Sequence, residues 1–168
     1  IPMPPPGPGL AAAVERGILL HRLFERLPGV AANDRRAAAL RWLQNSAGIA
    51  EEARRMELAD AACSVIADPR FAELFEPSAL AEAPIAATLD DGRVIAGTVD
   101  RLLVTPSHVR VIDFKTGLQV PSGPSDVPRG HEAQMAAYAE ALRIIFPGRK
   151  VEAALLYTAG PQLIALGC

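Results

Sequence analysis

The chain has 168 residues, half of them hydrophobic, which is enough for a sizeable buried core in one compact domain. Its net charge of -2 provides no excess of Lys and Arg for a protein that holds nucleic acid by charge alone. Two cysteines, Cys63 and Cys168, are too few for a four-cysteine zinc or iron-sulfur site. Because no apolar run approaches the ~20 residues of a membrane span and no signal segment is visible, we expect a soluble, cytoplasmic protein with reduced cysteines.

The first nine residues, IPMPPPGPG, are dense in Pro and Gly, a composition typical of an interdomain linker. We therefore expect residues 1–9 to join a folded domain over 10–168 to the rest of a larger protein. Helical periodicity covers 10–27, where a Pro-Gly pair stops it. Two further helices, rich in Ala and Leu, are predicted over 34–47 and 49–66.

Between Pro84 and Phe114 the hydrophobic pattern changes to the alternation of strands, with turn signals at Asp91-Gly92 and at TPSH. This pattern predicts a three-stranded antiparallel meander. A Pro- and Gly-rich loop leads into a helix over 131–146, and a strand, VEAALLYT, with a short partner, QLIAL, closes the chain. The expected fold is of the α/β (α+β) class.

Charged residues occupy two of these strands. If TPSH is the turn between the second and third strands, counting back in twos places Asp100 opposite Asp113. Such opposed residues have Cβ atoms only ~5 Å apart on one face, so two carboxylates there would repel each other without a cation. Because side chains alternate along a strand, Lys115 projects on the same face as Asp113. Three charged groups are thus expected on one side of one hairpin.

Oxygen ligands that converge in this way suit a hard divalent ion such as Mg2+ or Mn2+. Such an ion can polarise a phosphodiester and lower the pKa of bound water, while a neighbouring Lys offsets charge in the transition state. The pattern favours phosphodiester hydrolysis. The alternative is that Asp113 and Lys115 form an exposed salt bridge of little energetic weight. The cross-strand match to Asp100 favours the metal site.

The segment GTVDRL followed by VIDFKTG, an Asp and then Asp-x-Lys, resembles the catalytic core of the PD-(D/E)XK nuclease superfamily, in its RecB-like branch. Upstream, GILLHRLFE resembles that branch's helical G-x-x-x-H-R-L-x-E element. Downstream, Gln134 and Tyr138 match its Q-x-x-x-Y helix. Each motif is weak alone, but together and in the right order they are specific. The resemblance implies a restriction-endonuclease-like core, which is a central mixed sheet with an antiparallel three-strand meander flanked by helices, and extra N-terminal helices.

Within this branch the chain is most similar to the C-terminal nuclease domains of bacterial AddA proteins, the helicase-nuclease subunits of AddAB double-strand break repair complexes. This similarity covers roughly residues 15–166 and includes ADPRFAELF, GTVDRLLV and VIDFKTG. It implies that the partners are DNA, a helicase portion of the same polypeptide and an AddB-like subunit, with no membrane. The chain itself carries no G-x-x-x-x-G-K-[ST] phosphate loop for ATP hydrolysis.

The resemblance also implies roles for individual residues. Asp100 and Asp113 would ligate Mg2+ or Mn2+ together with the backbone carbonyl of Phe114, and Lys115 would be the catalytic lysine. His21 corresponds to the branch's helical histidine, a metal ligand, although a lone helical His is more often a packing residue. Related nucleases hold an iron-sulfur cluster with four cysteines, and none is expected in a chain with two.

Three further residues are candidates for supporting roles. Gln134 and Tyr138 lie four apart on one helical face, where they would bind the DNA backbone or support the catalytic lysine. The alternative for Tyr138 is a core ring with its hydroxyl at the surface. Glu82 is a candidate metal ligand or supporting residue on the first strand. The predicted two-residue turn would place Ala83 opposite Asp100 instead, and a bulge at Gly97 would correct this parity.

Two functions remain open from the sequence. The first is a metal-dependent DNA exonuclease or endonuclease that processes double-strand break ends, with the strand ending 3′ as the substrate implied by the resemblance. The alternative is a catalytically silent nuclease-fold domain that guides DNA or docks a subunit. The intact acids and lysine favour the first. His108 and His131 are given no role, because His is common in turns and at the start of helices.

Overall fold

The computed structural model describes residues 7–167, and these divide after Asp68 into two compact units. Most of the predicted linker lies in residues 1–6, outside the described residues. Its last two residues, Pro8 and Gly9, instead open the first helix. Pro is tolerated there because the N–H of a first helical residue has no partner within the helix. In residues 7–167, the helices are all too short or too polar to cross a membrane.

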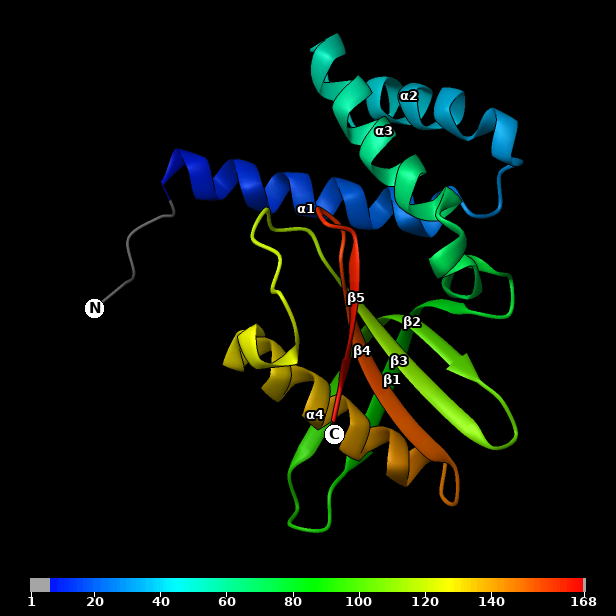
Figure 1. Cartoon of the computed structure of the whole chain (residues 1–168), viewed down its shortest axis with the longest axis vertical. Helices are drawn as coiled ribbons and strands as arrows, with labels where there is room; N and C mark the ends of the chain where they lie inside the picture. Colours follow the sequence, from blue (N-terminus) through cyan, green and yellow to red (C-terminus); the bar gives the residue numbers. More distant parts are fainter. Residues whose placement is uncertain (1–6, 168) are drawn as a thin grey trace. The chain divides into compact units, whose positions relative to one another are not determined.

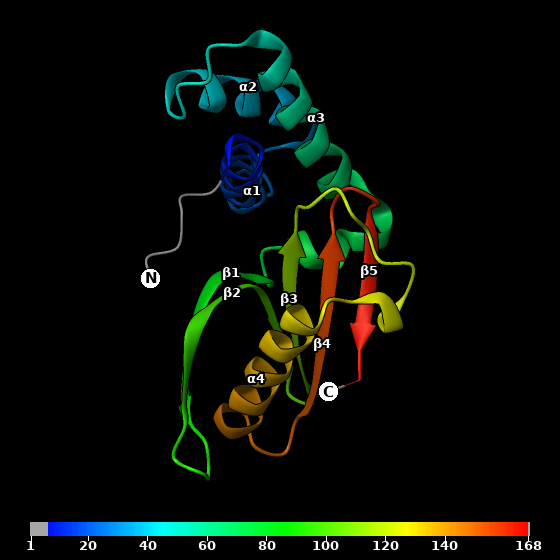
Figure 2. The ribbon, with the colours of Figure 1, turned by 90° about the vertical axis from the view of Figure 1, so that its left-hand side faces the viewer.

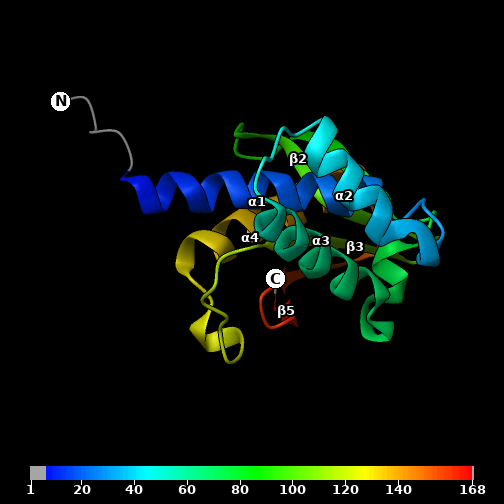
Figure 3. The same ribbon diagram turned by 90° about the horizontal axis from the view of Figure 1, so that it is seen from above.

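The first unit is helical. It contains α1 (Pro8–Arg26), α2 (Arg35–Asn45) and α3 (Glu52–Ala67), with a short 3-10 turn, η1 (Ala32–Asp34), before α2. Helix α3 packs against both α1 and α2 (Figures 1 and 3). The three helices were all predicted, and each begins or ends within a few residues of its expected limit.

The second unit is built on one five-stranded sheet of order β1-β2-β3-β4-β5. Strands β1 (Leu80–Thr88), β2 (Val94–Val104) and β3 (His108–Lys115) form the antiparallel meander. After a 3-10 turn, η3 (Pro124–Asp126), helix α4 (Arg129–Ile145) carries the chain to β4 (Lys150–Tyr157), which runs parallel to β3. Strand β5 (Gln162–Leu166) then pairs antiparallel with β4. The meander and the mixed sheet confirm the predicted class.

Helix α4 covers one face of the sheet, and the β1–β2 hairpin curves beside it (Figure 2). Along β3, alternation places Val109 and Val111 in the core beneath α4. The opposite face of β3 carries Phe114, whose ring stacks on Phe75 of the 3-10 segment η2 (Pro69–Phe75) at a centroid distance of 5.7 Å. The odd-numbered residues of β3, which include Asp113, therefore face α4.

The turn between β1 and β2 differs from the predicted one. Thr88 pairs with Val94, and the N–H of Leu89 donates to the carbonyl of Arg93 at 2.7 Å. The Leu89–Arg93 pair is therefore closed by a turn of three residues, 90–92, and not by the predicted two. Gly92 in this turn has a φ of 87°, a left-handed conformation that glycine adopts without steric cost. The extra turn residue moves the register of the whole hairpin by one.

Ala81 pairs with Arg101, and Ala83 pairs with Val99. Glu82, which lies between the two alanines, is therefore opposite Asp100. The predicted pairing of Ala83 with Asp100 is therefore wrong. The β1–β2 pairs keep one register on both sides of Gly97, so the correction of parity does not come from a bulge at this residue. The longer turn supplies the change of parity that a bulge was expected to supply.

Candidate active site

Asp100 lies where β2 departs from regular alternation. Val99 and Leu102 both belong to the core beneath α4, although a regular strand would place residues three apart on opposite faces. Across from Asp100, Glu82 has a φ of 49°, a left-handed conformation that non-glycine residues rarely adopt. Both strands are therefore distorted at this point. Unusual backbone conformations of this kind gather at functional sites, where surrounding contacts hold them in place.

Backbone pairing between β2 and β3 stops at Arg101 and Ile112. Just beyond it, Asp100 Oδ2 accepts a hydrogen bond from the backbone N–H of Phe114 at 2.7 Å. The carboxylate thus satisfies a backbone donor at the end of the ladder, and a bond with a charged acceptor is stronger than one between neutral groups. Since Asp100 is only 9% exposed, this contact fixes its side chain at the edge of the core.

Asp113 is equally buried, with 8% of its surface exposed. The pKa of Asp113 is raised to about 7, chiefly by burial and then by the hydrogen bond and charge of Asp100, while Lys115 acts against the rise. The Nζ atom of Lys115 lies 2.7 Å from Asp113 Oδ2. The structure therefore brings two buried acids and one ammonium group together at one end of the β2–β3 hairpin.

Helix α4 holds the lysine from the other side. Lys115 Nζ donates to Gln134 Oε1 at 3.0 Å, and Gln134 Nε2 donates to the hydroxyl of Tyr138 at 3.4 Å. Tyr138 in turn lies against Gly97 of β2, where an added Cβ would be 2.9 Å from the Tyr138 oxygen. Glycine at this position is thus explained by the close approach of a ring. The helix and the sheet together position the amine.

Two other candidates lie elsewhere in the sequence. Glu82 is half-buried on β1, across from Asp100. His21 lies on α1 in the first unit, and its Nδ1 donates to the carbonyl of Gly17 at 2.8 Å. In a neutral ring this bond places the proton on Nδ1 and a lone pair on Nε2, the form in which imidazole binds metals. A ligand role for either residue remains a prediction from the resemblance.

The donor set at Asp100 and Asp113 fits a divalent cation. Burial, and then the neighbouring Asp100, raise the pKa of Asp113, so ionising both acids beside the single ammonium of Lys115 is costly unless a cation is bound. Carboxylate oxygens are the hard ligands that Mg2+ and Mn2+ prefer. Clusters of three or more His, Cys, Asp or Glu side chains that could hold a metal do not occur within residues 7–167.

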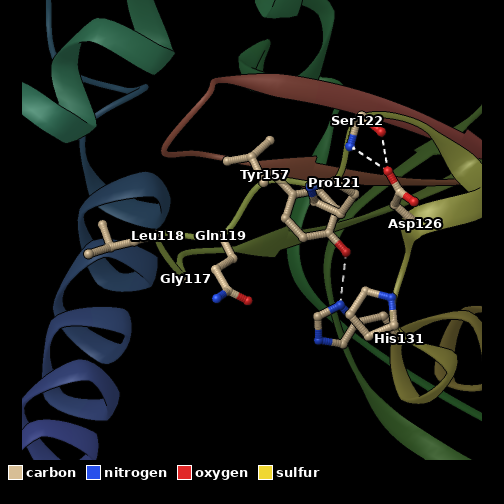
Figure 4. Close-up of a pocket in the computed structure, with 10 residues that line it drawn as sticks. Gly117, Leu118, Gln119, Pro121, Ser122, Asp126, His131 and Tyr157 are labelled. Atoms are coloured by element: carbon tan, nitrogen blue, oxygen red, sulfur yellow. Dashed lines mark hydrogen bonds between the residues drawn. The ribbon is translucent and has the colours of Figure 1, made fainter.

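A second feature next to this site was not found from the sequence. Strand β4 places Tyr157 beside Lys115 in the parallel register, and the Tyr157 hydroxyl forms a 2.9 Å hydrogen bond with Nδ1 of His131 on α4. Both residues line a cavity that loop 117–128 closes on the other side (Figure 4). No local pattern could have shown this, because the three segments meet only when β4 pairs with β3.

Comparison with known proteins agrees with this geometry. A family model described as the PD-(D/E)XK nuclease superfamily matches residues 2–163. The crystal structure of SSO0001 aligns with 89% of this chain and 74% of its own, at 16% sequence identity and a TM-score of 0.37, which is too weak a likeness to carry an argument. The search of curated proteins finds no match.

The family model covers nearly the whole sequence, including the distorted strands and the helix that supports Lys115. The mixed five-stranded sheet with α4 across one face fits the restriction-endonuclease-like core that the resemblance implied. The chain belongs to the PD-(D/E)XK nuclease superfamily.

Proposed function

We propose that this chain is a metal-dependent nuclease that hydrolyses the phosphodiester bonds of DNA. The observation that carries the proposal is the meeting of Asp100, Asp113 and Lys115 at the end of the β2–β3 hairpin. Membership of a nuclease superfamily supports it independently. A buried cluster of like charges is costly to the fold, and a role in catalysis explains why it is present.

Asp100 and Asp113 would hold a Mg2+ or Mn2+ ion together with the backbone carbonyl of Phe114. In an extended strand the N–H and C=O of one residue point to the same side, and the N–H of Phe114 points to Asp100. The bound ion would polarise the phosphodiester and lower the pKa of a water molecule. On the resemblance alone, His21 is proposed as a further ligand and Glu82 as a ligand or supporting residue.

Lys115 would act on the substrate directly. Its ammonium group has three N–H donors, of which one is directed to Asp113 and one to Gln134. The third can then reach a phosphate oxygen or the attacking water. Because the amine is held in advance by two partners, it can offset the charge that develops in the transition state with little reorganisation. Tyr138 would keep Gln134 in place for this task.

A cleavage assay with linear DNA tests the proposal. In Mg2+ or Mn2+, wild-type protein should cleave, while Asp113→Ala and Lys115→Ala should lose about a hundredfold or more in rate. Asp90→Ala, which removes an exposed carboxylate in the β1–β2 turn, is the matched control and should cleave normally. Equal cleavage by all four proteins would reveal a contaminant and remove the enzymatic proposal. DNA binding without any cleavage would support the silent-domain alternative.

The resemblance to AddA proteins supports a more specific setting. We propose that the chain processes double-strand break ends in recombinational repair in the bacterial cytoplasm, joined to a helicase portion and working with an AddB-like subunit. In that setting the strand ending 3′ is the expected substrate. Linear duplexes labelled at either the 3′ or the 5′ end test this, since the 3′ label should be released first when the helicase portion is present.

A further inference from the structure

The cavity beside the acidic cluster has a volume of about 560 Å3. This lies within the ~300–1,000 Å3 range of small-molecule sites. Its mostly apolar wall is made by three parts of the chain, the loop after β3, the end of β4 and the first turns of α4, which contribute residues 117–122, Asp126, Pro128, His131 and Tyr157. Figure 4 shows the Tyr157 hydroxyl directed at the His131 ring, while Ser122 and Asp126 are hydrogen-bonded to each other in the loop.

The cavity adjoins the proposed catalytic lysine. Lys115 pairs with Tyr157 across β3 and β4, and the carbonyl of Lys115 accepts the N–H of Thr158 at 2.9 Å. The loop that forms the cavity begins at Gly117, two residues after Lys115. Burial lowers the pKa of His131, and the positive charge of Lys115 lowers it further, as expected for neighbours. A strand whose phosphate lies at Lys115 would therefore have its adjacent nucleotide at this opening.

The lining selects against a phosphate and in favour of a base. It contains one acid, Asp126, and, among the residues that the structure describes around it, no Lys or Arg. The ring it offers to a ligand is that of half-buried His131. The Tyr157 ring, only 2% exposed, packs beside His131 with a tilt of 39° and a centroid distance of 6.0 Å. A partly exposed imidazole, held by the hydroxyl of Tyr157, suits a nucleobase, which has a π-face for stacking and polar atoms along its rim.

We propose that this cavity takes the base of a nucleotide adjacent to the scissile phosphate. The inference deepens the proposed nuclease function and rests on it. A base can enter only when it is unpaired and unstacked, so the preferred substrate is single-stranded DNA or a frayed end. Because stacking is available to every base, the cavity accepts all four bases. His131 binds the substrate and Tyr157 positions the His131 ring through its hydroxyl, and neither residue takes part in breaking the bond.

Binding of short single-stranded oligonucleotides, each with one abasic site at a different position, tests the assignment. Fluorescence anisotropy is measured with Ca2+ in place of Mg2+, and intact length is checked on a gel. For the wild type, the lesion at one position should raise Kd about five- to hundredfold. In His131→Ala and Tyr157→Phe, intact DNA should bind more weakly than it does to the wild type. The lesion at that position should then raise Kd only slightly further. Tyr157→Phe keeps the buried ring, so it answers the question if His131→Ala fails to fold.

His108→Ala is the matched control. It removes an exposed imidazole at the opposite end of β3 and should keep the wild-type dependence on the lesion. The assignment is overturned if no lesion position separates wild type from both cavity variants, or if duplex DNA binds as tightly as single strands. Because the measured quantity is DNA binding, the two proposals can fail separately. If the protein does not cleave DNA but its binding depends on the lesion position, the nuclease proposal is refuted and the cavity assignment stands. If it cleaves DNA but its binding does not depend on the lesion position, the cavity assignment is refuted and the nuclease proposal stands.

Discussion

Replacing Asp113 with Asn should stabilise the metal-free protein at alkaline pH. The folded protein raises the pKa of this carboxyl from 3.8 to about 7, chiefly by burial and then through Asp100. The folded state therefore binds the proton more tightly than the unfolded state does. Stability from this group is fully present below about pH 4 and is lost as the pH rises toward 7. Asn keeps the shape of the acid without its charge, so the variant does not suffer this loss.

The size of the effect follows from the shift. A rise from 3.8 to about 7 is about 3 pH units, and at about 1.4 kcal/mol per unit the ionised form costs the fold up to about 4 kcal/mol. The opposing attraction of Lys115 is already included in this shift. The gain from Asp113→Asn should thus approach a few kcal/mol near pH 8 and vanish near pH 4.

Urea unfolding in EDTA at several pH values measures the gain as the difference between variant and wild type. Asp91→Asn provides a control of opposite sign, because hydrogen bonds from the backbone and side chain of Arg93 lower the pKa of Asp91. That variant should lose stability near neutral pH and regain parity in acid. If Asp113→Asn is destabilised equally at pH 4 and pH 8, the reasoning about the buried charge is wrong.

Three more outcomes are expected. Because a proton and a metal ion compete for Asp113, the apparent affinity for Mn2+ measured by calorimetry should rise about tenfold per pH unit below pH 7 and level off above it. A pH-independent affinity would exclude this carboxyl as a ligand. Gln134→Ala should slow cleavage about tenfold with little change in folding, since it removes one partner of the lysine, and an unchanged rate would show that this contact is dispensable. Gly97→Ala should lower the free energy of unfolding by about 1–3 kcal/mol because its Cβ would crowd the Tyr138 hydroxyl. In this last experiment the control is Gly130→Ala in α4, which meets no atom within 4 Å and should lose no stability. Tyr138→Phe in the Gly97→Ala background should restore part of the loss.

Much of the fold could be predicted because it depends on local periodicity. The helices and strands have hydrophobic repeats that differ between the two kinds of element, and Gly and Pro mark most of their ends. The hairpin between β2 and β3 was also predictable, since its short turn sets the register by counting. That register brings Asp100 and Asp113 close together, and residue alternation adds Lys115.

The register of β1 was not predictable in the same way. A turn of three residues at Gly92 is as compatible with the sequence as one of two, yet it moves Glu82 rather than Ala83 opposite Asp100. The choice depends on how both strands bury their side chains under α4, which is a property of the assembled sheet. The reason for glycine at position 97, which is the close packing of the Tyr138 ring, likewise appears only when α4 is packed on the sheet.

The sequence by itself determined the element types, the sheet's antiparallel meander and the pair of acids with their lysine, because each follows from spacings of a few residues. Only the tertiary structure decided the bond of Asp100 to the Phe114 amide, the support of Lys115 by Gln134 and the cavity at His131 and Tyr157. These contacts join residues 14 to 26 positions apart in the chain. The first contact lies between β2 and β3 and depends on the distortion of β2 at Asp100. The other two require α4 on the sheet, and the cavity also requires β4 as the parallel neighbour of β3, a pairing that no short-range pattern encodes.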